Sequence, residues 1–119
     1  MTVTVESIRW LSAEAQEAVV TLSDGAYRCD AFCHPCALSP AEPIDSCLDA
    51  MDCRSCVVEP QGTFHIRQLA GFAHEVRATL IDHIHRLVAV GDFRIRIDDL
   101  PGDARVGDTL GFTCARLDL

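Results

Sequence analysis

The sequence predicts an all-β protein, and three observations lead to this prediction. Apolar and polar residues alternate with a period of two in about seven short runs. Glycine, proline and aspartate residues separate these runs, as they do in turns between strands. Strand-like and helix-like segments do not alternate, so nothing indicates a parallel sheet with helical crossovers. With 119 residues, 49% of them hydrophobic, the chain is expected to form one domain spanning residues 1–119.

The N-terminal third is expected to contain a bulged strand and a hairpin. The apolar positions of residues 3–10 alternate in two phases that disagree, which predicts a first strand with a bulge near Glu6 or Ser7. Asp24-Gly25 lies between two strand-like runs and is the strongest hairpin signal in the chain. The second strand of this hairpin places three residues on one face, namely Cys29, Ala31 and Cys33.

Residues 37–58 are expected to form a cysteine-rich insert that is partly helical. Pro40 and Pro43 prevent a regular element at its start. Beyond them, apolar residues recur at helical spacing, which predicts a short helix from about Pro43 to Met51. Cys47 lies on the apolar stripe of this helix and is expected to be a buried small hydrophobic residue.

The most regular alternation follows, in residues 76–97. Gly91-Asp92 is typical of a two-residue turn, and this turn opposes Val90 to Phe93. The resulting register gives the hairpin an apolar inner face, apart from Arg86 near its end. A last strand comes after residues 100–103, and its alternation changes phase near Ala115.

The C-terminal half resembles the closing part of an OB-type β-barrel. The resemblance is carried by the long run from Val76 to Val90, the turn that follows it, and the segment VGDTLGF before the last strand. It implies a small OB-like antiparallel barrel of about six or seven short strands, to which the insert is attached. OB-type barrels commonly bind single-stranded nucleic acid or oligosaccharide on one sheet face, using exposed aromatic and basic side chains.

Six of the seven cysteines lie within residues 29–56. Two C-x-x-C pairs, separated by sixteen residues, have the spacing of a zinc ribbon. A structural zinc ion is therefore one hypothesis, and buried or free thiols and disulfides are the alternatives. The zinc ligands would be Cys33, Cys36, Cys53 and Cys56, with Cys29 or His34 as substitutes.

The first pair, in the segment CHPC, also resembles the C-x-P-C loop of thioredoxin-like oxidoreductases. In that loop the first cysteine begins a helix, which lowers the pKa of its thiol. Here Pro40 and Pro43 follow too closely for a long helix, and the βαβ pattern of that family is missing. Thiol–disulfide redox chemistry therefore stands as an alternative function.

A second candidate site consists of basic residues near the predicted hairpin, namely His83, His85, Arg94 and Arg96, with Arg77. His83 and His85 would share a strand face, and Arg94 and Arg96 would share a face beside His85. Such a stripe could bind a phosphate, a nucleic-acid strand or an acidic partner. The alternative is a solvated face with arginine–aspartate pairs, which is the commoner situation on protein surfaces.

The sequence contains no Gly-rich phosphate loop, G-x-S-x-G elbow or H-E-x-x-H motif, which favours a small binding or interaction module rather than an enzyme. The net charge of −8 disfavours nucleic acid and anionic membranes as partners, although a local basic patch would be compatible with single-stranded nucleic acid. The N-terminal residues lack a signal-peptide pattern and no apolar run has membrane-spanning length, so a cytoplasmic location is expected. Open edge strands make a homodimer or another protein partner an expectation to test.

Overall fold

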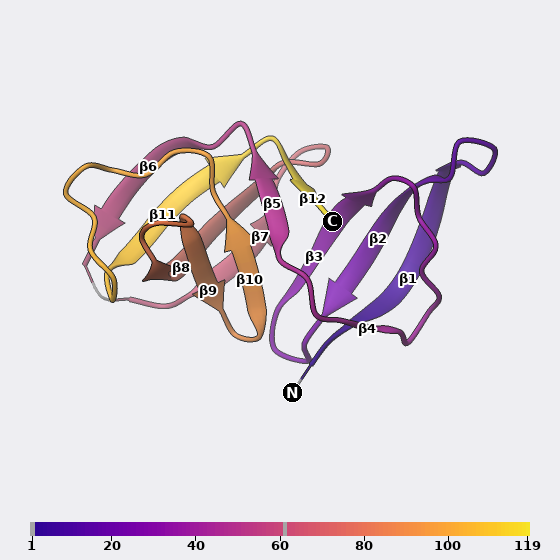
Figure 1. The fold of residues 1–119 in the computed structure, drawn as a ribbon, viewed down its shortest axis with the longest axis horizontal. Coiled ribbons are helices and arrows are strands. Elements are labelled where there is room, and N and C mark those ends of the chain that lie inside the picture. Colours follow the sequence, from indigo (N-terminus) through magenta and orange to yellow (C-terminus); the bar gives the residue numbers. More distant parts are fainter. Residues whose placement is uncertain (1, 61) are drawn as a thin grey trace.

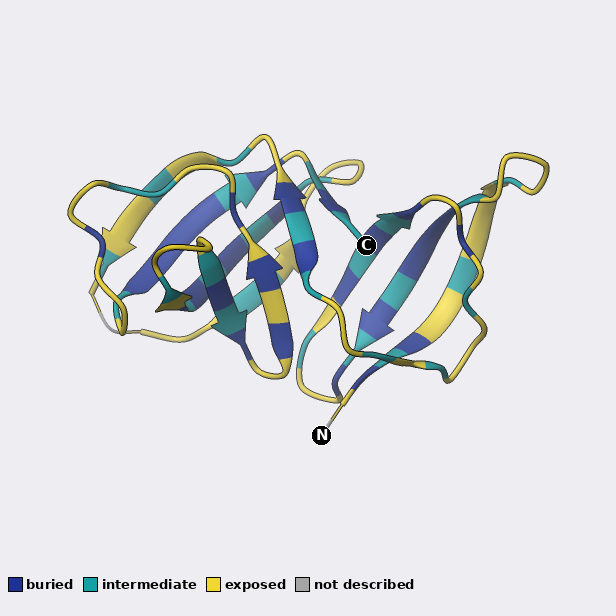
Figure 2. Ribbon diagram, viewed as in Figure 1, coloured by how far each residue is buried: buried dark blue, intermediate teal, exposed yellow. Residues whose placement is uncertain are grey.

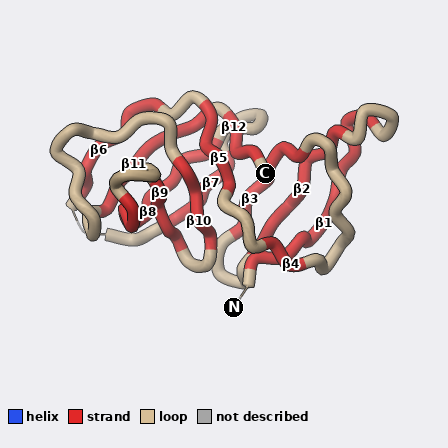
Figure 3. Tube along the Cα trace, viewed as in Figure 1, coloured by secondary structure: helices blue, strands red, loops and turns tan. Residues whose placement is uncertain are grey.

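The computed structural model describes residues 2–60 and 62–119, and its regular elements are all β-strands (Figures 1 and 3). In chain order they are β1 (Val3–Ser12), β2 (Glu17–Ser23), β3 (Arg28–Cys33), β4 (Pro43–Ile44), β5 (Leu48–Met51), β6 (Arg54–Glu59), β7 (His65–Gln68), β8 (His74–Asp82), β9 (Leu87–Val90), β10 (Phe93–Arg96), β11 (Thr109–Cys114) and β12 (Arg116–Asp118). The all-β class is thus confirmed. None of the described segments is a helix that could cross a membrane.

The twelve strands form one hydrogen-bonded sheet that remains open. Its order is β4-β1-β2-β3-β12-β5-β10-β9-β8-β11-β6, and β7 pairs with β8 beside this path. The expected small barrel of six or seven strands is therefore wrong in both strand number and closure. The period-two pattern identified strands correctly. It did not show that bulges and turns would divide some of the runs into separate strands, or that the expected insert would contribute strands of its own.

The short C-terminal strand β12 connects the two halves of the molecule (Figure 1). It pairs in parallel with β3, where Leu117 lies opposite Ala31, and antiparallel with β5, where Leu117 lies opposite Ala50. All three of these side chains are buried. The N-terminal sheet of β1, β2 and β3 is thereby continuous with the sheet that carries β8 and β11.

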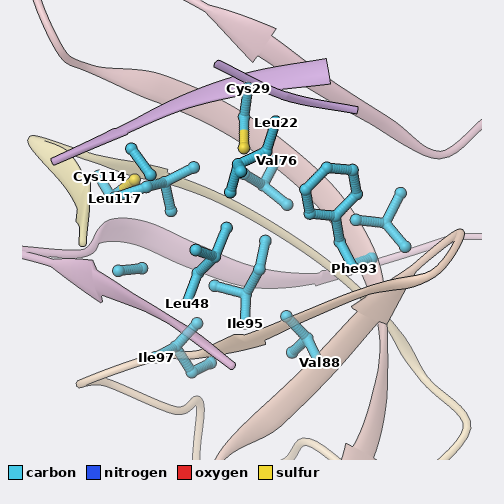
Figure 4. Close-up of a cluster of buried hydrophobic side chains, with 14 of the residues drawn as sticks. Leu22, Cys29, Leu48, Val76, Val88, Phe93, Ile95, Ile97, Cys114 and Leu117 are labelled. Atoms are coloured by element: carbon cyan, nitrogen blue, oxygen red, sulfur yellow. The ribbon is translucent and has the colours of Figure 1, made fainter. Parts of the chain in front are cut away.

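A single hydrophobic core extends across both halves. Leu22 and Cys29 from the N-terminal hairpin lie in the same cluster as Phe93, Ile95 and other residues of the C-terminal half (Figure 4). Buried and exposed residues alternate along β10, which shows that one face of this strand contacts the core (Figure 2). The core is therefore built from period-two faces of strands that are distant in sequence.

Several local predictions are confirmed by the strand registers. The β1–β2 pairing shifts between Val5 and Ser7, which places the expected bulge at Glu6. Strands β2 and β3 pair across the Asp24-Gly25 turn, and β9 and β10 pair with Val90 opposite Phe93. The phase change at Ala115 separates β11 from β12.

The expected helix from Pro43 to Met51 is wrong, and so is the description of residues 37–58 as a partly helical insert. Pro43–Ile44 forms β4 and Leu48–Met51 forms β5. Strand β5 lies between β10 and β12, and it buries Leu48 and Ala50 while Met51 is exposed. The helical spacing was misleading because four residues with two neighbouring strands gain more from interstrand pairing than from an isolated helical turn.

The turns of the two hairpins meet at Asp24. Its Oδ1 atom accepts hydrogen bonds from the backbone N–H groups of Ala26 (2.9 Å) and Tyr27 (2.7 Å). Its Oδ2 atom accepts a hydrogen bond from the backbone N–H of Asp92 (2.9 Å), in the turn between β9 and β10. One carboxylate therefore shapes its own turn and fastens it to a turn 68 residues away in sequence.

Candidate functional site

A groove of about 330 Å³ lies on the outer face of the sheet formed by β6, β11, β8 and β7. The central strands β8 and β11 form its floor, and β6 and β7 flank them (Figure 1). We call it the outer groove. It is lined by Ser55, Glu59, His65, Arg67, Glu75, Val76, Arg77, Gly111, Phe112 and Thr113. Two arginines balance two glutamates, and a histidine accompanies them.

The alternation of β8 explains why charged side chains line this groove. Val76 and Ala78 are fully buried and face the core, so Glu75 and Arg77 point to the opposite side of the strand. Strand β11 pairs with β8 and places Gly111 directly opposite Arg77. The outer face of the two floor strands is consequently polar although the strands themselves are central.

Strand β7 brings two basic residues to the same face. His65 lies opposite Arg77 in the β7–β8 register, and Arg67 lies opposite Glu75. The Nε2–H group of His65 donates to Oε1 of Glu75 at 3.0 Å, and Nη2 of Arg67 lies 3.4 Å from the same oxygen. Glu75 therefore holds two basic side chains of a neighbouring strand in place.

Arg77 contacts the flanking strand β6 and the residue that follows it. Its Nε atom lies 2.9 Å from Oε2 of Glu59, and its Nη2 group donates to the backbone carbonyl of Pro60 at 3.0 Å. The Nε atom is buried, yet its N–H is not directed at the carboxylate and has no hydrogen-bond partner among the described residues. The contact with Glu59 is therefore an ion pair of poor hydrogen-bond geometry.

The glycine at position 111 leaves the space that Glu59 occupies. A Cβ atom at this position would lie 2.3 Å from Oε1 and 2.6 Å from Cδ of Glu59. The carboxylate thus rests over the backbone of β11, where any other residue would place its side chain. A larger residue at this position would fill the floor of the outer groove.

The structure does not assemble the predicted zinc ligands into one cluster. Cys33 ends β3, and its thiol contacts that of Cys36 just beyond the strand. Cys53 precedes β6, where its thiol donates to the backbone carbonyl of Ala50 at 3.5 Å, and Cys56 lies within β6. Among the residues described, no three His, Cys, Asp or Glu side chains are placed to hold one metal ion.

The thiols are free, and burial makes most of them weakly acidic. Burial raises the pKa of Cys53 to about 12 and the pKa of Cys56 and Cys114 to about 11. Burial, with the neighbouring Cys36 thiol, raises the pKa of Cys33 to about 11, and burial also raises the pKa of Cys29. These groups are neutral thiols near pH 7, whereas nucleophilic cysteines need a lowered pKa.

The predicted basic stripe is divided by the turn between β8 and β9. His83 and His85 both lie in this turn instead of sharing a strand face, and Nδ1 of His85 contacts Oδ2 of Asp82 at 2.8 Å. The Nη1 group of Arg94 donates to the backbone carbonyls of Gly91 at 3.1 Å and Phe93 at 3.0 Å. The expected continuous run from 76 to 90 is wrong because a tight turn splits it.

Arg96 is part of an exposed ion pair. Its Nη1 group donates to Oδ1 of Asp49 at 3.2 Å, from β10 to the neighbouring strand β5. Arg94 and Arg96 do share the exposed face of β10, as the alternation predicted. The arginine–aspartate pairing expected of a solvated face is therefore present, with Asp49 as the partner.

Sequence reasoning named Arg77 but missed the other charged residues of the outer groove. The signal was present, because His65 and Arg67 share one strand face and Glu75 shares another with Arg77. Pairing these two runs across the turn at residues 69–73 would have brought the four together. No protein-family model, curated protein or solved structure matches the chain.

Proposed function

We propose that this protein is a non-enzymatic binding module that holds a small polar molecule in the outer groove. The observation that supports the proposal is the convergence of five ionisable side chains from three strands on one hollow of about 330 Å³. Ligand pockets begin at about this size. The residues are Glu59 from β6, His65 and Arg67 from β7, and Glu75 and Arg77 from β8.

The position of the groove on rigid strands favours a binding role. Its floor lies on β8 and β11, whose opposite faces supply core residues such as Val76 and Leu110. A site on such strands is held in one shape, which lowers the entropy lost when a ligand binds.

The proposal can be tested by titrating the isotope-labelled protein and following its amide NMR signals. The titrants are small carboxylic acids, amino acids, sugars, inorganic phosphate and a single-stranded oligonucleotide at low and high salt. We expect a small polar compound to shift signals of β6, β7, β8 and β11. Salt-sensitive shifts centred on Arg94 and Arg96, produced only by the oligonucleotide, would instead support the nucleic-acid alternative.

A blocking variant makes the test specific to the groove. Gly111→Val adds a strand-favouring side chain that displaces the Glu59 carboxylate and fills the floor. Gly102→Val is the matched control, because a Cβ atom at Gly102 meets nothing within 4 Å. We expect binding to be lost in the first variant and retained in the second. Equal binding by both variants would refute the groove as the binding site.

A further inference from the structure

The outer groove contains an arginine whose ion-pair partner can be exchanged. Nε of Arg77 is buried beneath the Glu59 carboxylate, 2.9 Å from Oε2, and still lacks a hydrogen bond among the described residues. A buried donor without a hydrogen bond carries an energetic cost that a better-placed acceptor would remove. Arginine presents its N–H groups as a planar fork, whose natural partner is a planar pair of oxygens.

Glu59 is attached to the fold in a way that permits this exchange. It is the last residue of β6, which forms one end of the open sheet and, among the described strands, pairs with β11 alone. Its carboxylate rests over Gly111, so no side chain of β11 holds it from below. Swinging the carboxylate away from Arg77 requires a rotamer change in Glu59 and no opening of the core.

We propose that the outer groove recognises its ligand through a carboxylate group, which replaces the Glu59 carboxylate on Arg77. This inference rests on the proposed function and specifies the chemistry of the ligand. In the ligand-free protein Glu59 acts as an internal substitute for the ligand and keeps the arginine charge paired. Binding then exchanges one carboxylate for another, with the ligand forming the N–H···O hydrogen bonds that Glu59 does not form.

The charge of the groove favours a carboxylate over a phosphate. Arg67 and Arg77 balance Glu59 and Glu75, so a ligand with one negative charge is accommodated by one displaced glutamate. A phosphate dianion would bring a second negative charge close to Glu75, on a protein whose net charge is already −8. Glu75 is already contacted by His65 and Arg67 and remains in place.

The experiment follows the Nε–H signal of Arg77 by NMR while propionate, propionamide or inorganic phosphate is added to the folded protein. Propionamide has nearly the shape of propionate but no charge. We expect propionate alone to shift the signal. The variant Glu59→Gln removes the competing carboxylate and should tighten propionate binding about threefold to fivefold, which is the range of a partly exposed ion pair.

Matched variants separate this exchange from general charge effects. Asp49→Asn releases Arg96 from an exposed ion pair outside the groove and should leave propionate affinity unchanged. Arg77→Lys keeps the charge but loses the planar fork, so the shifts that propionate induces in the backbone amide signals of β6, β7, β8 and β11 should disappear. Glu59→Ala provides a second test of the released arginine if the glutamine variant does not fold.

The possible failures of the two proposals are distinguishable. Equal binding of propionamide and propionate, stronger binding of phosphate, or unchanged affinity in Glu59→Gln would each overturn the carboxylate assignment. Binding of another polar compound that is blocked by Gly111→Val would at the same time preserve the groove as a ligand site. Both proposals fail if no compound shifts the groove signals.

Discussion

Replacing Asp24 tests whether one buried carboxylate holds the two hairpin turns together. Asp24 is 4% exposed as a residue, and its side chain accepts hydrogen bonds from three backbone N–H groups, those of Ala26, Tyr27 and Asp92. Asp24→Ala removes all three acceptor contacts at once. The change should therefore loosen both the β2–β3 turn and its contact with the β9–β10 turn.

The expected loss of unfolding free energy is about 3 kcal/mol for Asp24→Ala, taking about 1 kcal/mol for each hydrogen bond. Asp24→Asn keeps an acceptor oxygen but loses the charge, so about half of that loss is expected. For a domain with a total stability of roughly 5–15 kcal/mol, both changes are large enough to measure. Asp103→Ala, at an exposed loop position, is the control and should cost less than about 0.5 kcal/mol.

Urea unfolding followed by circular dichroism provides the measurement, with the midpoint compared at unchanged slope. The pH dependence adds a second criterion. Burial raises the pKa of Asp24, but the N–H donors of Asp92, Tyr27 and Ala26 together lower this pKa by more than burial raises it. The net pKa is therefore below the ordinary value. The stabilisation should thus be present above about pH 4 and be lost as the pH falls through the folded-state pKa. If Asp24→Ala behaves like Asp103→Ala, the carboxylate does not connect the two turns.

Three further predictions concern a buried histidine, a glycine in a turn and the cysteine thiols. Burial lowers the pKa of His74, whose Nδ1–H donates to the Phe72 carbonyl at 2.9 Å. The unfolded chain therefore takes up the proton first, and stability should decrease as the pH falls below about 6.5; a wild-type slope matching that of His74→Gln between pH 6.5 and 5 would contradict this. Gly91→Ala should cost about 2 kcal/mol or more in urea unfolding, because Gly91 has a φ of 55° and the new Cβ would lie 2.3 Å from Oδ2 of Asp24. Gly71→Ala, with a φ of 65° and free space, should cost only about 1 kcal/mol, and equal losses would show that the contact with Asp24 is unimportant. The five thiols whose pKa is raised should react slowly with a disulfide reagent at pH 7 and faster as the pH rises; complete reaction of all seven cysteines in one fast phase would disprove their burial.

The sequence pattern predicted correctly those local features that depend on residues close in sequence. The bulge at Glu6 and the turns at residues 24–25 and 91–92 follow from phase and turn chemistry within about ten residues. The apolar face of β8 was also predicted correctly from the alternation of its residues. The helix predicted for residues 43–51 failed because its short apolar pattern fits both periods, and pairing with β10 and β12 decided between them.

The candidate site depended on contacts that local pattern does not contain. Sequence alternation indicates which side chains share a face of one strand, but not which strand lies beside it. Strand β11, near the end of the chain, lies between β6 and β8 in the sheet. Glu59 of β6 contacts Arg77 of β8 across this strand, so the contact depends on a pairing that is distant in sequence. The C-x-x-C spacing likewise predicted a shared metal site, whereas the fold places the two pairs on different elements.

The sequence by itself determined the strand class, the hairpin registers and the inward faces of the strands, because these follow from backbone geometry and turn residues over short distances. The tertiary structure decided that β12 joins the two halves, that residues 48–51 form a central strand, and that five ionisable side chains surround one groove. Such long-range pairings are selected by burial of a common core and by the closing of long loops. Both are properties of the whole chain, so no single segment encodes them.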